Sequence, residues 1–145
     1  MATTSQTFIQ AVAVQSQPTS RGWLWTGRTI TGLVIAFMLF DTAMHLLKPA
    51  PVVDAFKQLG LPISLSVPLG IISLICLASY ALPATNVLGA ILLTGDLGGA
   101  VATNMWVRHP LFETIFPVLV GVFVWAGVYL RDERLRVLLP WKSSM

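Results

Sequence analysis

The chain has 145 residues, of which 55% are hydrophobic and 10% charged, and its net charge is +3. A soluble domain carries about 25% charged residues, so this composition excludes an ordinary water-facing surface and indicates a membrane protein with lipid as a partner. The basic residues lie mostly toward the chain ends, without the aromatic and basic interleaving of a nucleic-acid surface. We therefore expect no nucleic-acid binding.

Residues 1–22 are polar and lack a basic stretch followed by a long apolar core. That pattern favours a flexible tail over a cleaved signal peptide. Residues 23–140 form the predicted transmembrane domain, and residues 141–145 form a second tail. The single cysteine, Cys76, excludes an intramolecular disulfide and a thiolate metal cluster.

Four apolar blocks make up the transmembrane domain, at residues 25–47, 63–82, 85–107 and 111–130. A helix of about 20 apolar residues spans the ~30 Å of hydrocarbon in a bilayer. Backbone polar groups in lipid have to be hydrogen-bonded within the chain, and the blocks lack the alternation of barrel strands. The sequence therefore predicts an all-α fold, a polytopic membrane protein with a four-transmembrane-helix bundle.

Small residues crowd the third block, which contains Gly89, Gly95, Gly98 and Gly99. Because small residues let transmembrane helices approach closely, we expect this block to be the most enclosed helix of the bundle. Between the first two blocks, the segment VVDAFKQLGL has apolar residues at helical spacing. We expect this segment to lie on the membrane surface or to contact a partner.

The distribution of basic residues orients the bundle in the membrane. An even number of spans places both termini on one side, together with six of the nine basic residues. The positive-inside rule then predicts that the N and C termini are cytoplasmic. The basic residues on the terminal side are Arg21, Arg28, Arg131, Arg134, Arg136 and Lys142, and those on the other side are Lys48, Lys57 and Arg108.

Two aspartates, Asp41 and Asp96, lie inside the first and third blocks. A carboxylate in hydrocarbon is costly, so such residues are rare and usually functional. At 1.5 Å per residue, Asp41 lies about 10 Å and Asp96 about 16 Å below the outer ends of their helices. His45 follows Asp41 by one helical turn on the same face. We predict that Asp41, His45 and Asp96 are the catalytic groups of any chemistry.

Further polar residues continue toward the outer rim, whereas the inner half of the bundle is almost wholly apolar. This asymmetry predicts either a polar pocket that opens outward or a buried network that seals the outer half. Helix packing, capping and interfacial anchoring are structural alternatives for the individual members. The residues expected to bind a ligand are Thr103, Asn104, Arg108, His109 and Glu113.

A metal site is a further alternative, because Asp41 with His45 and His109 with Glu113 each place a carboxylate and an imidazole four residues apart. Two such pairs could hold Zn²⁺ or Fe²⁺. The spacing is common by chance, however, and no motif such as HExxH accompanies it. We therefore predict no metal; the cofactor, if there is one, is unknown from the sequence, and a quinone is one candidate.

Two stretches of the chain carry a family resemblance: LFDTAMHLLKPAPVVDAFKQLGLP and TGDLGGAVATNMWVRHPLFETIF. In their order and spacing they resemble the DoxX-like family of small bacterial membrane proteins, and the resemblance covers residues 33–140. It implies four helices in the bacterial inner (cytoplasmic) membrane, and relatives are linked to a thiosulfate:quinone oxidoreductase and to redox stress. His45 and Asn104 depart from the family pattern, in which Lys and His are common at these positions.

Two functions remain open from the sequence. In the first, the pocket binds a small hydrophobic molecule with a polar head, such as a quinone or an isoprenoid. The protein is then a quinone-linked oxidoreductase subunit or an isomerase-type enzyme. In the second, it is a non-enzymatic accessory or assembly subunit of a larger membrane complex. A homo-oligomer or a membrane protein partner fits both, and a transporter is less favoured because the sequence has no detectable inverted repeat.

Overall fold

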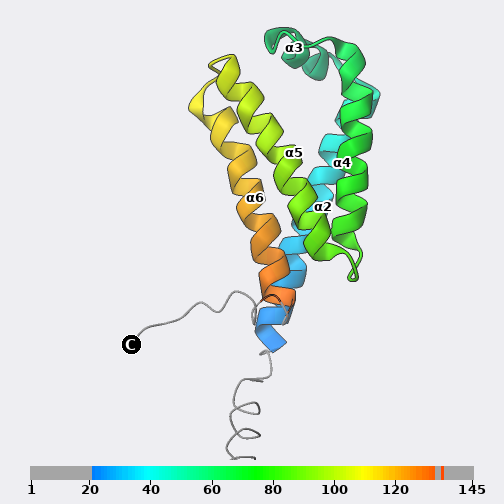
Figure 1. Cartoon of the computed structure of the whole chain (residues 1–145), viewed down its shortest axis with the longest axis vertical. Coiled ribbons are helices and arrows are strands. Elements are labelled where there is room, and N and C mark those ends of the chain that lie inside the picture. The colour runs from blue at the N-terminus through cyan, green and yellow to red at the C-terminus, as the bar shows by residue number, and fades with distance from the viewer. Residues whose placement is uncertain (1–20, 133–134, 136–145) are drawn as a thin grey trace, which may run out of the picture.

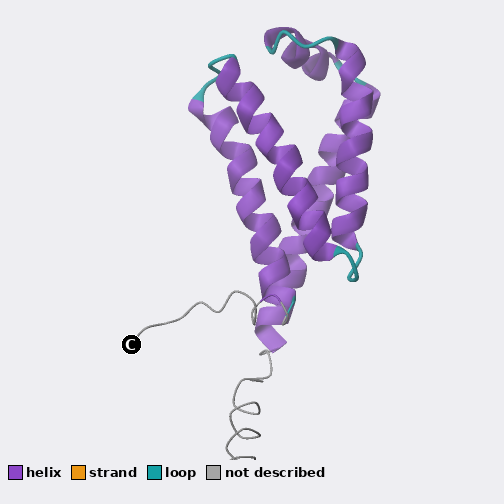
Figure 2. Ribbon diagram, viewed as in Figure 1, coloured by secondary structure: helices purple, strands orange, loops and turns teal. Residues whose placement is uncertain are grey.

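The computed structural model describes residues 21–132 and residue 135 of the chain. These residues form helices and connections and contain no strand, as Figure 2 shows. The elements are α2 (Arg21–Leu47), α3 (Ala50–Gln58), the short 3-10 helix η1 (Ile63–Leu65), α4 (Ser66–Ala81), α5 (Asn86–Trp106) and α6 (Leu111–Arg131). The predicted all-α fold is confirmed.

Four of these segments are long and apolar enough to cross a membrane, namely α2, η1 with α4, α5 and α6. The predicted four-span organisation is therefore confirmed, with bounds within a few residues of those read from hydropathy. The predicted tails at residues 1–20 and 141–145 lie outside the described residues. Residues 21 and 22, at the end of the first predicted tail, belong instead to α2.

The four spans pack as a ring in which α2 contacts α4, α4 contacts α5, α5 contacts α6, and α6 returns to α2. The start of α2 and the end of α6 lie side by side, since a Cβ at Gly27 would be 2.8 Å from the Cβ of Leu130. The helix α3 lies across the opposite end of the bundle, which we call the α3 end (Figure 1). Both described chain ends are thus on one side, as an even number of spans requires, and the identity of that side stays a prediction.

Prolines mark where several helices begin. Pro49 occupies the N-cap of α3, Pro62 the N-cap of η1, and Pro110 the N-cap of α6. A proline nitrogen has no hydrogen to leave unsatisfied at a helix start, so these positions tolerate it. Pro117 lies inside α6, where it is buried. The connections at residues 82–85 and 107–110 are short, whereas the connection at residues 48–62 contains α3.

The tightest packing lies at the end of the bundle away from α3. Tyr80, Leu93, Val124 and Val128 are fully buried there. Gly89 permits this approach, because a Cβ at that position would clash with the Tyr80 backbone nitrogen. Tyr80 also donates a hydrogen bond of 3.1 Å from its hydroxyl to the Val124 carbonyl, which joins α4 to α6.

The expectation that the third span is the most enclosed helix is wrong. Of the four spans, α5 has the smallest buried share, and its buried residues Gly89, Ala90 and Leu93 all lie in its first half. Beyond them, a Cβ at Gly95, Gly98 or Gly99 would meet no neighbouring atom within 4 Å. Small residues permit close approach of a second helix but do not supply that helix. Figure 1 shows α5 and α6 diverging from α2 and α4 toward the α3 end.

Candidate functional site

The predicted acid Asp41 and His45 lie together near the carboxyl end of α2. They are four residues apart, so they share one face of the helix, and Nε2 of His45 is 3.8 Å from Oδ2 of Asp41. The Asp41 side chain is 44% exposed and the His45 side chain 26% exposed. Among the described residues, Asp41 makes this ion pair but no side-chain hydrogen bond.

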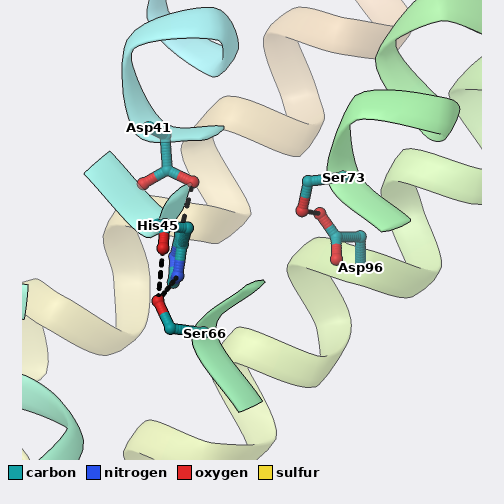
Figure 3. A network of polar contacts seen from close by, with 5 residues as sticks. All are labelled: Asp41, His45, Ser66, Ser73 and Asp96. Atoms are coloured by element: carbon teal, nitrogen blue, oxygen red, sulfur yellow. Dashed lines mark hydrogen bonds and ion pairs between the residues drawn. The ribbon is translucent and has the colours of Figure 1, made fainter. Parts of the chain in front are cut away.

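Ser66, the first residue of α4, fixes His45 from the neighbouring helix. Its hydroxyl donates a 2.7 Å hydrogen bond to the backbone carbonyl of His45 and lies 3.4 Å from His45 Nδ1. Ser66 is fully buried. One turn further along α4, Gly70 allows the close approach, since a Cβ there would lie 3.1 Å from the Cβ of His45. The imidazole is therefore held by α4, with its Nε2 directed to Asp41 (Figure 3).

The helix α3 covers the same histidine from the end of the bundle. Phe56 is the buried residue of α3, at 4% exposure. Its ring meets the His45 ring edge-on, with the centroids 5.8 Å apart and the planes at 74°. Aromatic pairs favour this arrangement because a positive ring edge meets a negative ring face. His45 thus has a carboxylate on its own helix, a serine on α4 and an aromatic ring on α3.

The second intramembrane acid, Asp96 on α5, has its own hydroxyl partner. The Ser73 hydroxyl on α4 donates a 2.8 Å hydrogen bond to Oδ2 of Asp96. Figure 3 shows this pair facing the group formed by Asp41, His45 and Ser66. The three residues predicted as catalytic therefore lie in one region, bridged by α4.

Sequence reasoning missed both serines of this site. Ser66, Gly70 and Ser73 are separated by four and three residues, so they lie along one face of α4. All three are buried, in a helix whose other positions are mostly apolar. The only signal in the sequence was the spacing of these hydroxyls on both sides of a glycine in an apolar block, and it does not distinguish a contact with another helix from a hydrogen bond within α4.

Three of the five predicted ligand-binding residues gather at the connection between α5 and α6. Asn104 donates a 3.2 Å hydrogen bond to the Glu113 carbonyl, and the His109 backbone nitrogen donates one of 3.0 Å to the Asn104 carbonyl. The Nδ1 atom of His109 also contacts the Glu113 carboxylate. These contacts close the turn between two helices, and each of the three residues uses polar groups within it.

The other two predicted ligand-binding residues take no part in these contacts. The Thr103 hydroxyl donates a 2.8 Å hydrogen bond to the Gly99 carbonyl of its own helix. Arg108 is exposed and has a positive φ of 55° in the same connection. The structure therefore divides the predicted site into the Asp41–His45–Asp96 region and the α5–α6 turn. Within the described residues, no group of three or more His, Cys, Asp or Glu side chains could hold a metal ion.

A cavity of about 430 Å³ lies elsewhere, between α5 and α6. Its lining is apolar apart from Thr94, whose hydroxyl already accepts a 2.9 Å hydrogen bond from Trp125 and donates one of 2.7 Å to the Ala90 carbonyl. None of the three predicted catalytic residues lines it. This cavity has no free polar group for a ligand head, so the polar chemistry remains with the region around Asp41.

A family model described as the DoxX-like family matches residues 29–127. The match covers more than half of the 145-residue chain, and the chain belongs to that family. The matched region includes all five residues drawn in Figure 3, namely Asp41, His45, Ser66, Ser73 and Asp96. No curated protein and no solved structure matches the chain. The family and the four spans agree on a multi-pass membrane protein.

Proposed function

We propose that this member of the DoxX-like family binds a small hydrophobic molecule with a polar head group, quinone-like or isoprenoid-like, beside Asp41, His45 and Asp96. The observation that carries the proposal is the exposure and hydrogen bonding of the Asp41 side chain. Its side chain is nearly half exposed inside a membrane-spanning helix, and it makes no hydrogen bond among the described residues. A carboxyl group at such a depth needs a polar partner, and a ligand head group would supply one.

The surroundings suit a molecule with one polar end. A quinone carbonyl accepts hydrogen bonds, and Asp41 in its protonated form or His45 in its doubly protonated form can donate one to it. Gly99 follows Asp96 by three residues, and its open surroundings leave room beside that carboxyl group. The apolar faces of the spans would contact the rest of the molecule.

In this proposal Asp41 and His45 exchange protons with the head group. They form a carboxyl and imidazole pair on one helix face, which is a common arrangement for general acid–base work. A redox-linked role would require electrons from a partner protein or from the ligand itself. An acid–base isomerase would need neither. We place the protein in the bacterial inner membrane, with both termini cytoplasmic.

A non-enzymatic accessory subunit is the second candidate function. It is favoured by the serine contacts, because Asp96 is hydrogen-bonded by Ser73 and the His45 backbone by Ser66. Polar contacts of this kind join transmembrane helices without any ligand. Asp41 is the residue that the accessory function does not explain, since it has no comparable hydrogen bond among the described residues.

The test is to measure the binding of a short-chain quinone to the purified protein in lipid nanodiscs. Quenching of tryptophan fluorescence reports the binding. We expect Asp41→Asn to raise the Kd about tenfold, equivalent to the loss of about 1.4 kcal/mol of hydrogen bonding. Asp54→Asn is the matched control, because Asp54 is exposed on α3 and pairs with Lys57 at 3.4 Å. It should leave the Kd unchanged. Equal Kd values for Asp41→Asn, Asp96→Asn and the unchanged protein would reject the proposed pocket.

A further inference from the structure

We propose that α3 is a lid over His45, with Phe56 as the residue that holds it closed. The lid alternates between the bundle and the membrane interface, and it uncovers His45 when it leaves. The identity of what it admits rests on the proposed function, whereas the opening itself does not.

The packing of α3 shows how lightly it is attached. Among the described elements, α3 packs mainly against η1, and this contact is far smaller than the contacts between neighbouring spans. Phe56 is its one buried residue, and the partner of that ring is the site histidine. A helix held mainly by one aromatic side chain opens more readily than the bundle that it covers, because less buried apolar surface has to be exposed.

On each side of α3, the backbone contains a residue in the left-handed region. Lys48 precedes it with φ of 50°, and Gly60 follows it with φ of 67°. Glycine adopts this left-handed region freely, but a lysine there is strained. The strain at Lys48 exists in the closed position, where Lys48 also ends α2 through a 3.0 Å hydrogen bond to the Met44 carbonyl. Rotation at Lys48 and Gly60 would move α3 as a unit.

The amphipathic composition of α3 allows the open lid to lie in the membrane interface. Its partly buried and buried residues Val52, Val53 and Phe56 recur at helical spacing on one face. Asp54 and Lys57 are exposed on the remainder. An amphipathic helix of this kind can lie in the membrane interface with its apolar face in lipid. Lipid then covers the apolar face in place of the bundle, which keeps the two positions of the lid close in free energy.

The test measures access to the covered site by thiol labelling. In a Cys76→Ala background, Ser66→Cys places a thiol in the fully buried position beside His45. The labelling rate reports the fraction of time that the site is open. We expect Phe56→Ala to raise this rate about tenfold, and Phe56→Leu to raise it less because it keeps most of the apolar volume. Val53→Ala, on the same helix face, is the matched control and should change the rate little.

A second thiol separates opening of the lid from loosening of the bundle. Ser79→Cys lies near the other end of α4, away from α3, and its labelling rate should not respond to Phe56→Ala. Faster labelling at position 66 with no response at position 79 supports the lid. The lid is overturned if Phe56→Ala accelerates both positions equally or leaves position 66 at the rate of the Val53→Ala control.

Ligand kinetics then distinguish the lid from the proposed function. With a short-chain quinone, Phe56→Ala should raise the association and dissociation rates together, since a lid changes the path more than the bound state. Faster labelling without any quinone binding supports the lid and rejects the proposed pocket. Normal quinone binding with unchanged labelling rejects the lid and leaves the pocket in place.

Discussion

Asp41 and Asp96 carry the same functional group but differ in their hydrogen bonding. Asp96 accepts a 2.8 Å hydrogen bond from Ser73, whereas Asp41 has the longer contact of 3.8 Å with His45. A hydrogen bond between transmembrane helices contributes roughly 1 kcal/mol, because the unfolded helices in lipid find other partners. Asp96 therefore contributes to helix association, and Asp41 retains hydrogen-bonding capacity for another molecule.

Ser73→Ala tests the structural part of this difference. We expect it to lower the free energy of unfolding by roughly 1 kcal/mol, because Asp96 loses its donor in a partly buried position. The measurement is detergent-induced unfolding followed by circular dichroism. Ser79→Ala is the control, since the Ser79 hydroxyl bonds the Ile75 carbonyl of its own helix at 2.9 Å. An equal effect from the two substitutions would contradict the assigned role of Ser73.

The acids could be found from the sequence because a charge in an apolar block is costly wherever its partners lie. The serines could not be assigned in this way. In a transmembrane helix, a hydroxyl can bond the carbonyl four residues earlier, as Ser79 and Thr103 do. Ser66 and Ser73 instead bond neighbouring helices. The residue type is the same in both cases, so tertiary placement decides between them.

At the scale of elements, α4 is the helix that joins the others. Ser66, Ser73 and Tyr80 are each seven residues apart on α4, and they donate hydrogen bonds to α2, α5 and α6 respectively. The heptad spacing keeps the three hydroxyls near one face over about 21 Å of helix length. One polar face of a single helix therefore contacts all three partners, at different depths in the membrane.

The glycines of α5 supply a prediction at the same scale. Gly89→Ala should lower the free energy of unfolding by about 3 kcal/mol, because the added methyl group meets the backbone of Tyr80. Gly99→Ala should leave it unchanged or raise it by less than about 1 kcal/mol, since the methyl group meets nothing and alanine favours the helix. Unfolding in detergent measures both, and similar losses for the two variants would contradict the packing described for α5.

The elements themselves were readable from hydropathy, because a spanning helix has to satisfy every backbone group and cover them with apolar side chains. The helical spacing of the apolar residues in VVDAFKQLGL also predicted an amphipathic segment, and this segment forms most of α3. The depth of burial of α5 was not readable. Glycine marks a surface that can be approached, and at Gly89 a helix approaches it, but at Gly95 none among the described elements does.

At the scale of the whole molecule, the described residues form a ring of four spans that is closed at one end and has α3 at the other (Figure 1). Its described chain ends and the connection between α4 and α5 lie on the closed side. The excess of basic residues on the side of the chain ends predicts that this side is cytoplasmic. Three of the basic residues behind that prediction, at positions 134, 136 and 142, lie outside the described residues.

Cysteine labelling in intact cells tests this orientation. In a Cys76→Ala background, Asp54→Cys on α3 should react with a membrane-impermeant maleimide added outside, because position 54 is exposed at the α3 end. Ala84→Cys, exposed in the turn between α4 and α5, should react after the cells are permeabilised and not before. The reverse pattern would place the termini outside and contradict the positive-inside assignment.

The hydrogen bond between Ser73 and Asp96 also bears on biosynthesis. Of the four spans, α5 has the lowest mean hydropathy, and an aspartate near a helix centre opposes insertion by about 2.5–3.5 kcal/mol. α4 precedes α5 in the chain, so it leaves the ribosome first. When α5 reaches the translocon, α4 is already in the bilayer, together with the Ser73 hydroxyl that hydrogen-bonds Asp96. The least hydrophobic span, α5, is therefore synthesised directly after α4, whose Ser73 can lower the cost of inserting Asp96 into the membrane.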